Sequence, residues 1–175
     1  MAQKIYSFAP VISENARILI LGSMPGDASL EADQYYAHPR NAFWPIMGRL
    51  LGFMPDIAYE QKIARLKASG VALWDVLFSC HREGSLDSEI RQESVNDING
   101  LLKHHTSISH IYLNGTKAEA SFKRHILPTL KPTTPEWARL PSTSPAHAAL
   151  SMDEKYRTWR IIADVLKGKA VPVTL

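Results

Sequence analysis

A loop bracketed by two glycines, Gly22-Ser23-Met24-Pro25-Gly26, directly follows the apolar run Ile18 to Leu21. Shortly afterwards, the segment Gln34 to Trp44 gathers two tyrosines, a histidine, an arginine and an asparagine. Such a segment makes a poor hydrophobic core, but its side chains can stack on a ring and exchange hydrogen bonds. Because open α/β sheets bind ligands outside the carboxyl ends of their strands, we predict a binding or catalytic site here.

Two further apolar runs end in polar loops, which span residues 80–87 and 141–147. The second loop, Pro141 to His147, offers three hydroxyl groups, and these together with backbone N–H groups could hold phosphate oxygens. An ordinary polar turn between a strand and a helix has the same composition, so the spacing alone leaves both interpretations open. In a parallel sheet, the carboxyl-end loops all meet at one edge.

Strands and helices alternate along the chain. The apolar, β-prone runs are Arg17 to Leu21, Val71 to Phe78, Ile108 to Leu113 and Glu136 to Leu140. Helical patterns lie at Phe43 to Leu51, Ile57 to Ala68, Ile98 to His105, Ala118 to Ile126, and Ser151 to Leu166, where Ser151 and Glu154 have the spacing of a capping box. This order predicts a three-layer α/β/α fold with a mainly parallel four-stranded sheet.

Length and composition place limits on the class of protein. The 175 residues, 45% of them hydrophobic, are enough for one domain spanning 1–175, with a tail from about Lys167 that we expect to be loosely packed. The formal net charge is only +3, yet a sequence pI of about 9.0 is compatible with an acidic partner such as nucleic acid. No apolar run reaches membrane-spanning length and no signal peptide is evident, so we expect a soluble cytoplasmic protein.

The cysteine and histidine content argues against cofactors. A single cysteine, Cys80, excludes an internal disulfide framework and a cysteine-rich zinc or iron–sulfur site. The seven histidines lack paired ligand spacing, and the adjacent His104 and His105 would point in different directions from a helix. We therefore expect no metal and no cofactor.

At this point a family resemblance becomes specific. The segments Gly22 to Gly26, Tyr36 to Trp44 and Leu140 to Ser144 resemble the two signature loops of the uracil-DNA glycosylase superfamily, and they are most similar to its hypoxanthine-DNA (deoxyinosine) glycosylase branch. The resemblance implies a pocket for a flipped base, DNA as partner, and hydrolysis of the bond between a deaminated base and deoxyribose during base excision repair. No lysine lies inside either loop, which favours a monofunctional and, we expect, monomeric enzyme over a Schiff-base lyase.

The catalytic position differs from that of mismatch-specific relatives. Those relatives keep an asparagine in the first loop where this chain has Met24, and a thioether cannot orient water as an amide does. In the deoxyinosine branch the asparagine of the His-Pro-Arg-Asn segment takes this role, which assigns Asn41 as the residue that positions the attacking water. Asn41 also precedes a helical stripe, where an asparagine could simply cap the first turn.

The resemblance assigns further residues to the base pocket. Tyr36 would stack on the flipped base, although a half-buried tyrosine is otherwise usually part of the packing, and Tyr35 is a second candidate. His38 would contact the pocket or else bond a backbone carbonyl, and the backbone N–H groups of 22–26 would face the base. Asp75 falls where uracil-specific members read the base with an asparagine, so it would accept the ring N–H of hypoxanthine or bond a neighbouring loop.

Other residues are candidates for contact with the DNA strand. The DNA-binding set that we predict is Arg40, Arg82, Ser142, Thr143, Ser144 and His147. Arg40 and Arg82 would bind phosphates or remain solvated, and the hydroxyl loop would hold phosphates. His147 lies where superfamily members push a residue into the gap left by the flipped nucleotide, a role it could share with Pro145 or Ala146. Asn114, before Gly115, reads as a helix cap.

Three alternatives remain open from the sequence. Uracil or xanthine could be the excised base, because uracil and hypoxanthine present a similar N–H and carbonyl edge. A non-catalytic module that senses damaged DNA would use the same stacking and phosphate loops. A hydrolase of free nucleosides would show little salt-dependent binding to duplex DNA.

Overall fold

A parallel sheet of four strands forms the centre of the computed structural model, which describes residues 2–132, 135–169 and 171. Its strands are β2 (Ile18–Gly22), β3 (Val71–Asp75), β6 (His110–Asn114) and β7 (Glu136–Leu140), in the order β3-β2-β6-β7. All neighbouring pairs are parallel. The mainly parallel four-stranded sheet predicted from the sequence is confirmed.

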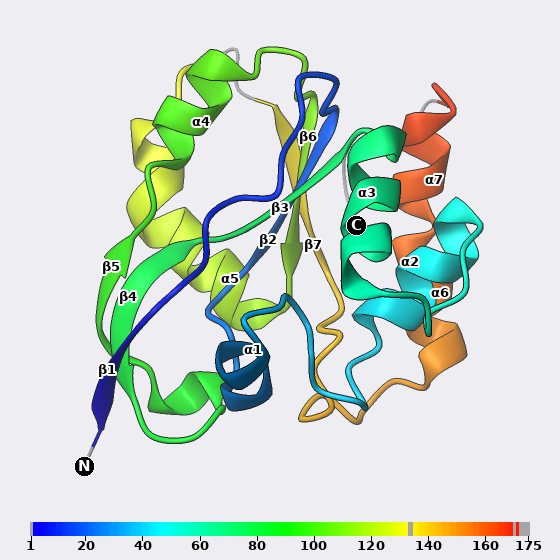
Figure 1. Cartoon of the computed structure of the whole chain (residues 1–175). Helices are drawn as coiled ribbons and strands as arrows, with labels where there is room; N and C mark the ends of the chain where they lie inside the picture. Colours follow the sequence, from blue (N-terminus) through cyan, green and yellow to red (C-terminus); the bar gives the residue numbers. More distant parts are fainter. Residues whose placement is uncertain (1, 133–134, 170, 172–175) are drawn as a thin grey trace.

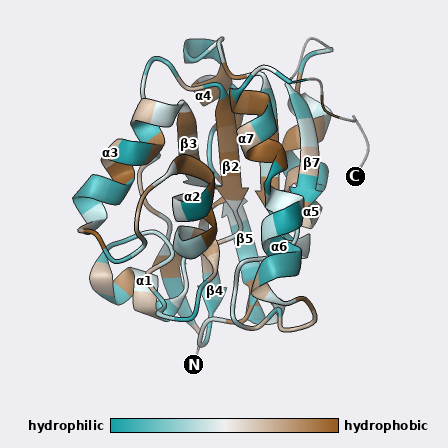
Figure 2. Cartoon of the chain, turned by 90° about the vertical axis from the view of Figure 1, so that its right-hand side faces the viewer, coloured by the Kyte–Doolittle hydropathy of each residue, from teal (hydrophilic) through white to brown (hydrophobic). Residues whose placement is uncertain are grey.

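Strand β2 is buried along its whole length because both of its neighbours and both helical layers cover it. Its uninterrupted apolar sequence is what a strand covered on both faces requires. Figure 2 shows β2 as a continuous hydrophobic strip in the middle of the molecule, whereas the outer sides of α3 and α6 are hydrophilic.

Helices cover the two faces of this sheet, as Figure 1 shows. On one face lie α2 (Phe43–Leu51), α3 (Tyr59–Ser69), α6 (Met152–Trp159) and α7 (Ile161–Leu166). On the other lie α4 (Ile98–His104) and α5 (Thr116–Ser121), which continues as a π-helical turn, Phe122–Ile126, and a 3₁₀ turn, Leu127–Thr129. The short α1 (Asp27–Ala32) sits at the carboxyl edge of the sheet. The three layers are as predicted.

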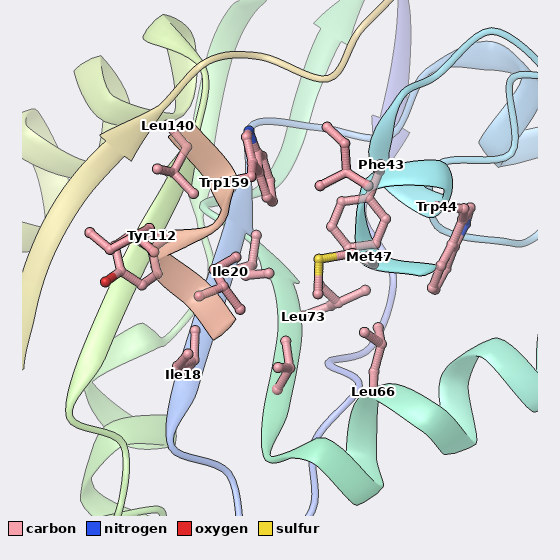
Figure 3. Close-up of a cluster of buried hydrophobic side chains, with 14 of the residues drawn as sticks. Ile18, Ile20, Phe43, Trp44, Met47, Leu66, Leu73, Tyr112, Leu140 and Trp159 are labelled. Atoms are coloured by element: carbon pink, nitrogen blue, oxygen red, sulfur yellow. The ribbon is translucent and has the colours of Figure 1, made fainter. Parts of the chain in front are cut away.

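The apolar core on the α2 side reaches the edge where the strands end. Figure 3 shows Phe43 and Met47 of α2, Trp159 of α6 and Ile20 of β2 in one cluster of buried side chains. Phe43 and Trp159 are fully buried, and their rings meet edge to face at 5.9 Å. The helix that begins at Phe43 is therefore fixed to the sheet directly beside the first signature loop.

One predicted strand was wrong, because the run Val71 to Phe78 divides between two sheets. It ends as β3 at Asp75, and β4 (Leu77–Arg82) begins after Val76 in a separate antiparallel sheet with β1 (Gln3–Tyr6) and β5 (Arg91–Val95), in the order β1-β4-β5. The Asn96 side chain donates to the carbonyls of Asp75 and Leu77, which holds the chain where it changes sheet. Residues 80–82 are consequently strand, and the polar loop begins at Glu83.

The predicted last helix is also two helices, α6 and α7, which meet at Arg160. Its start is confirmed, since Ser151 and Glu154 form the expected capping box. The backbone N–H of Lys169 donates to Asp164, and Val171 packs on the core; residues 170 and 172–175 of the predicted tail lie outside the described residues. Among the described helices, none has the length and apolar content to cross a membrane.

Candidate active site

A cavity of about 550 Å³ opens at the carboxyl edge of the parallel sheet. Its walls come from the loops after β2, β6 and β7, from the β4–β5 loop, and from the segment that precedes α2. This volume lies within the range of about 300–1,000 Å³ that is typical of small-molecule sites. The loops that the sequence predicts to meet at this edge of the sheet therefore enclose a cavity.

The loop Gly22 to Gly26 lines the cavity through all five residues. A Cβ atom at Gly22 would lie 2.5 Å from Asp75 Oδ1 and 3.2 Å from the Tyr36 hydroxyl oxygen, so only glycine permits this close approach. Met24 is buried in the apolar cluster on the α5 side and presents a thioether, not an amide, to the cavity.

Asp75 is the most unusual charged group in the cavity wall. It is 4% exposed, and its Oδ2 atom is buried without a hydrogen-bond partner among the described residues. Burial and the nearby Asp87 carboxylate raise the pKa of Asp75 to about 7, against the opposing effect of the Arg82 guanidinium. Near neutral pH this carboxyl group is therefore able to donate a hydrogen bond as well as accept one.

Arg82 does not occupy the exposed position predicted for a DNA contact. Its side chain is fully buried: Nη2 donates to the Pro25 carbonyl at 2.6 Å and Nε donates to the Gly84 carbonyl at 2.6 Å. Because β4 extends to Arg82, the guanidinium turns inward and ties the first signature loop to the β4–β5 loop. The structure thus corrects this prediction, and Arg82 holds the cavity wall from behind.

Two more hydrogen bonds connect the same pair of loops. The Ser23 hydroxyl donates to Asp87 Oδ1 at 2.7 Å, and the backbone N–H of Asp27 donates to Ser85 Oγ at 2.8 Å. The β4–β5 loop, Glu83 to Ile90, is therefore held against the β2 loop at several points. This rigidity fixes one wall of the cavity.

Tyr36 also lines the cavity and has a left-handed backbone conformation, with φ of 56°. Its ring stacks on Phe43 with centroids 4.0 Å apart and an interplanar angle of 21°. Burial and the Asp75 charge raise the pKa of Tyr36, so it remains a neutral phenol. The other candidate, Tyr35, is 4% exposed and donates its hydroxyl to the Ala9 carbonyl, which makes it chiefly a packing residue.

Asn41 lines the cavity and also makes a local hydrogen bond immediately before α2, whose N-cap residue is Ala42. Its Oδ1 accepts from the backbone N–H of Phe43 at 2.9 Å, at the first turn of α2. An amide oxygen has two lone pairs, so one remains for another donor. His38 lines the cavity while its Nδ1 accepts from the Arg40 backbone, and the Arg40 side chain is exposed outside the cavity lining.

Asn114 has a place in the cavity wall that the sequence reasoning missed. It does not cap α5; instead, its Nδ2 donates to Thr143 Oγ1 at 2.9 Å and to the Tyr36 hydroxyl at 3.2 Å, while its Oδ1 accepts from the Thr143 backbone at 3.0 Å. One buried amide therefore joins the two signature loops. Its position at the end of a parallel strand, where the cavity-lining loops begin, could have identified it.

Thr143 also differs from its predicted role. It is 1% exposed, and its carbonyl accepts from the Ala42 backbone at 2.9 Å in addition to its bonds with Asn114. The hydroxyl is thus held inside the protein, away from a DNA phosphate. Ser142 and Ser144, by contrast, are partly exposed on the cavity wall.

The loop that carries His147 is held by two side chains of α6. The Lys155 ammonium, which is buried, donates to the His147 carbonyl at 2.7 Å, and burial lowers the pKa of Lys155. The Trp159 indole N–H donates to the Pro141 carbonyl at 2.9 Å. The His147 side chain lines the cavity, so this loop faces the β4–β5 loop across the same opening.

We predict that Asn114→Ala destabilises the protein by about 1–3 kcal/mol, because the buried Thr143 N–H then lacks an acceptor. Urea unfolding followed by circular dichroism measures this difference. The exposed Asn15 provides a matched control, for which alanine should change the free energy of unfolding by no more than about 0.5 kcal/mol. Equal small effects of the two variants would show that the Asn114 amide does not connect the loops in solution.

The family of the chain follows from comparison with known proteins. A model of the uracil DNA glycosylase superfamily matches residues 9–165, and the chain belongs to that superfamily. A protein named hypoxanthine DNA glycosylase from Methanosarcina acetivorans is 40% identical over 149 residues, covering 85% of this chain and 91% of the relative. A protein of the same name from Methanosarcina barkeri is 40% identical over 116 residues, covering 66% of this chain and 73% of the relative.

A solved structure supports the same relationship. The solution NMR structure of a provisionally assigned uracil DNA glycosylase from Methanosarcina acetivorans superposes with a TM-score of 0.81 at 37% sequence identity, covering 94% of this chain and 99% of that one. The resemblance noted in the two signature loops is thereby confirmed over nearly the whole fold. In the part of the chain that the structure describes, no group of three potential metal ligands comes together.

Proposed function

We propose that this protein is a monofunctional DNA glycosylase that removes deaminated bases from DNA, with hypoxanthine as the principal base. The observation that carries the proposal is the cavity itself, which combines the Tyr36 ring, the Asn41 amide and the unpartnered carboxyl group of Asp75. The names of the two archaeal relatives support hypoxanthine as the substrate. A deaminated nucleotide in DNA would turn out of the duplex and place its base in this cavity.

Recognition of the base would use three groups. The base would stack on the face of Tyr36 opposite Phe43, since Phe43 already covers one face of that ring. Protonated Asp75 would accept the N1–H of hypoxanthine and donate its own proton to the base carbonyl. The His38 ring and the backbone of Gly22 to Gly26 would complete the wall around the base.

Hydrolysis would use a water molecule held by Asn41. Its Oδ1 is already oriented by the Phe43 N–H, and the remaining lone pair would accept a hydrogen bond from water next to the anomeric carbon. The bond between C1′ and the base nitrogen breaks with its electron pair going to the base. Water adds to C1′ and loses a proton, and the departing base takes up a proton. Met24 offers no second amide for this step.

The DNA strand would be held at the edge of the cavity. We assign phosphate contacts to Ser142, Ser144 and Arg40, whose side chains are at least partly exposed, and a contact near the flipped nucleotide to His147. We further propose that one domain acts as a monomer in the cytoplasm, without a cofactor, and supplies abasic sites to base excision repair. The absence of lysine from both signature loops supports hydrolysis without strand cleavage.

In the decisive experiment, the purified protein is incubated with duplex oligonucleotides that carry one deoxyinosine, deoxyuridine or deoxyxanthosine. Alkali then converts each abasic site into a strand break. We expect breaks at deoxyinosine above all, none before alkali, and far fewer with the Asn41→Ala variant over the same time. Cleavage mainly at deoxyuridine would replace the substrate assignment, and tight binding without any abasic product would favour the damage-sensing module.

A further inference from the structure

The edge of the cavity carries one large exposed apolar side chain, Leu86. Among the described residues, the exposed large hydrophobic side chains are Tyr6, Met54, Phe78, Leu86 and Met152. Leu86 is 54% exposed, and of these five it alone lines the cavity. Solitary surface leucines are common, so its position needs further support before it has a functional meaning.

The loop that presents Leu86 is rigid. Its two neighbours along the chain are fixed to the first signature loop, Ser85 through the Asp27 backbone and Asp87 through the Ser23 hydroxyl. The Leu86 carbonyl accepts from the Glu89 backbone at 3.0 Å, which closes a 3₁₀ turn directly behind it. The leucine is therefore exposed on a fixed support instead of on a loose loop that could fold it inward.

The β7–α6 loop, which lines the same cavity, presents no comparable side chain there, since its Leu150 is only partly exposed and does not line the cavity. Between Ser144 and His147 it offers only Pro145 and Ala146 as apolar groups. A nucleotide that leaves the duplex creates a gap in the base stack, and proteins that distort duplex DNA commonly fill such gaps with bulky apolar side chains. Leu86 has the required size and chemistry at the opening through which the base would pass.

The charge around Leu86 restricts what it can contact. Glu83, Asp87 and Glu89 are acidic and exposed in the same loop, whereas Arg82 is buried behind it and Arg91, at the start of β5, donates to the Ser88 and Ile90 carbonyls. The exposed carboxylates of this loop disfavour contact with phosphates, so the leucine is better suited to contact bases than the loop is to contact the DNA backbone.

We propose that Leu86 inserts into the base stack of duplex DNA and occupies the space left by the flipped nucleotide. This inference rests on the proposed glycosylase function. It assigns the bulky apolar contact to the β4–β5 loop, with His147 on the other side of the opening. A single strand has no partner strand from which the nucleotide must be extracted, so Leu86 matters only for duplex substrates.

The test compares single-turnover excision from duplex and single-stranded oligonucleotides that carry deoxyinosine. We expect Leu86→Ala to lower the duplex rate by about tenfold or more, while the single-strand rate stays within about twofold, because the lost apolar contact forms only in the duplex. Leu86→Phe, which keeps a bulky apolar group, should restore most of the duplex rate. Met54→Ala removes an exposed side chain outside the cavity lining and should change neither rate.

A second readout separates this inference from the proposed function. With 2-aminopurine next to the deoxyinosine, binding of the wild-type protein should raise fluorescence as the stack opens, and Leu86→Ala should reduce this rise even if no base is released. The salt dependence of duplex binding should be unchanged, since no phosphate contact is lost. The assignment would be overturned if Leu86→Ala lost excision rate equally on duplex and single-stranded substrates, or if it left the rise in fluorescence unchanged. A duplex-specific loss of rate in His147→Ala but not in Leu86→Ala would overturn it as well.

Discussion

Asn41→Ala should lower the single-turnover rate of hypoxanthine excision by about 10²–10⁴-fold, the range expected when a positioned group that activates water is lost. Binding to duplex DNA that contains deoxyinosine should change much less, because the proposed role of Asn41 is to hold the water and not the strand. The two quantities are measured by excision with enzyme in excess and by fluorescence anisotropy at a fixed salt concentration. A large loss of rate with preserved binding identifies a contribution to the transition state.

The same substitution also removes the hydrogen bond from the Phe43 N–H, which costs about 1 kcal/mol of stability. Thermal unfolding therefore has to accompany the kinetics. Asn41→Asp is the matched control, because a carboxylate keeps an oxygen for the Phe43 N–H and should restore the stability. Normal excision by a slightly destabilised Asn41→Ala protein would mean that this residue is a helix cap and nothing more.

Asp75→Asn should change how the protein responds to pH. Because the pKa of Asp75 is raised to about 7 by burial and by Asp87, the native protein keeps this carboxyl group protonated at pH values where the unfolded chain has released its proton. The native state thus binds more protons, and its free energy of unfolding falls as pH rises from about 4 to about 7. The asparagine variant lacks this dependence and should be more stable by on the order of 2–4 kcal/mol above pH 7.

Catalysis should follow the same ionisation. Below about pH 7 the protonated Asp75 can donate to the base carbonyl, and above it the carboxylate cannot, so wild-type excision should decline through neutrality. The groups that act on Asp75 are Asp87 and Arg82, and the nearby Tyr35 and Tyr36 hydroxyls have raised pKa values and stay neutral in this range. Asp75→Asn always carries a donor and should show a flat profile from pH 6 to 8.

Urea unfolding and excision assays at several pH values measure both effects. Asp153, which is exposed and paired with Arg49, serves as the control, and Asp153→Asn should leave both pH profiles unchanged. A stability difference between wild type and Asp75→Asn that stays constant from pH 5 to 8 would contradict a buried, titrating carboxyl group at this position.

Features that depend on neighbours along the chain could be predicted from the amino-acid sequence alone. The apolar run that forms β2, the helical stripe that begins at Phe43 and the capping box of Ser151 and Glu154 all have the predicted structure. The positions of the signature loops also follow from the sequence, because a polar loop after an apolar parallel strand is placed at the edge of the sheet wherever that strand lies.

Tertiary contacts, by contrast, determine which polar side chains face the cavity and which ones hold its walls together. Arg82, Thr143 and Asn114 are polar residues in or beside loops, yet contacts with residues at least 29 positions away bury all three. Leu86 is the converse case. This apolar residue stays at the surface because hydrogen bonds hold its two neighbours, Ser85 and Asp87, against the β2 loop. Local sequence patterns indicate whether a residue prefers a helix face, a strand face or a turn. The burial and the pKa of a side chain depend on which distant segments pack against it, and this is determined by packing of the whole domain.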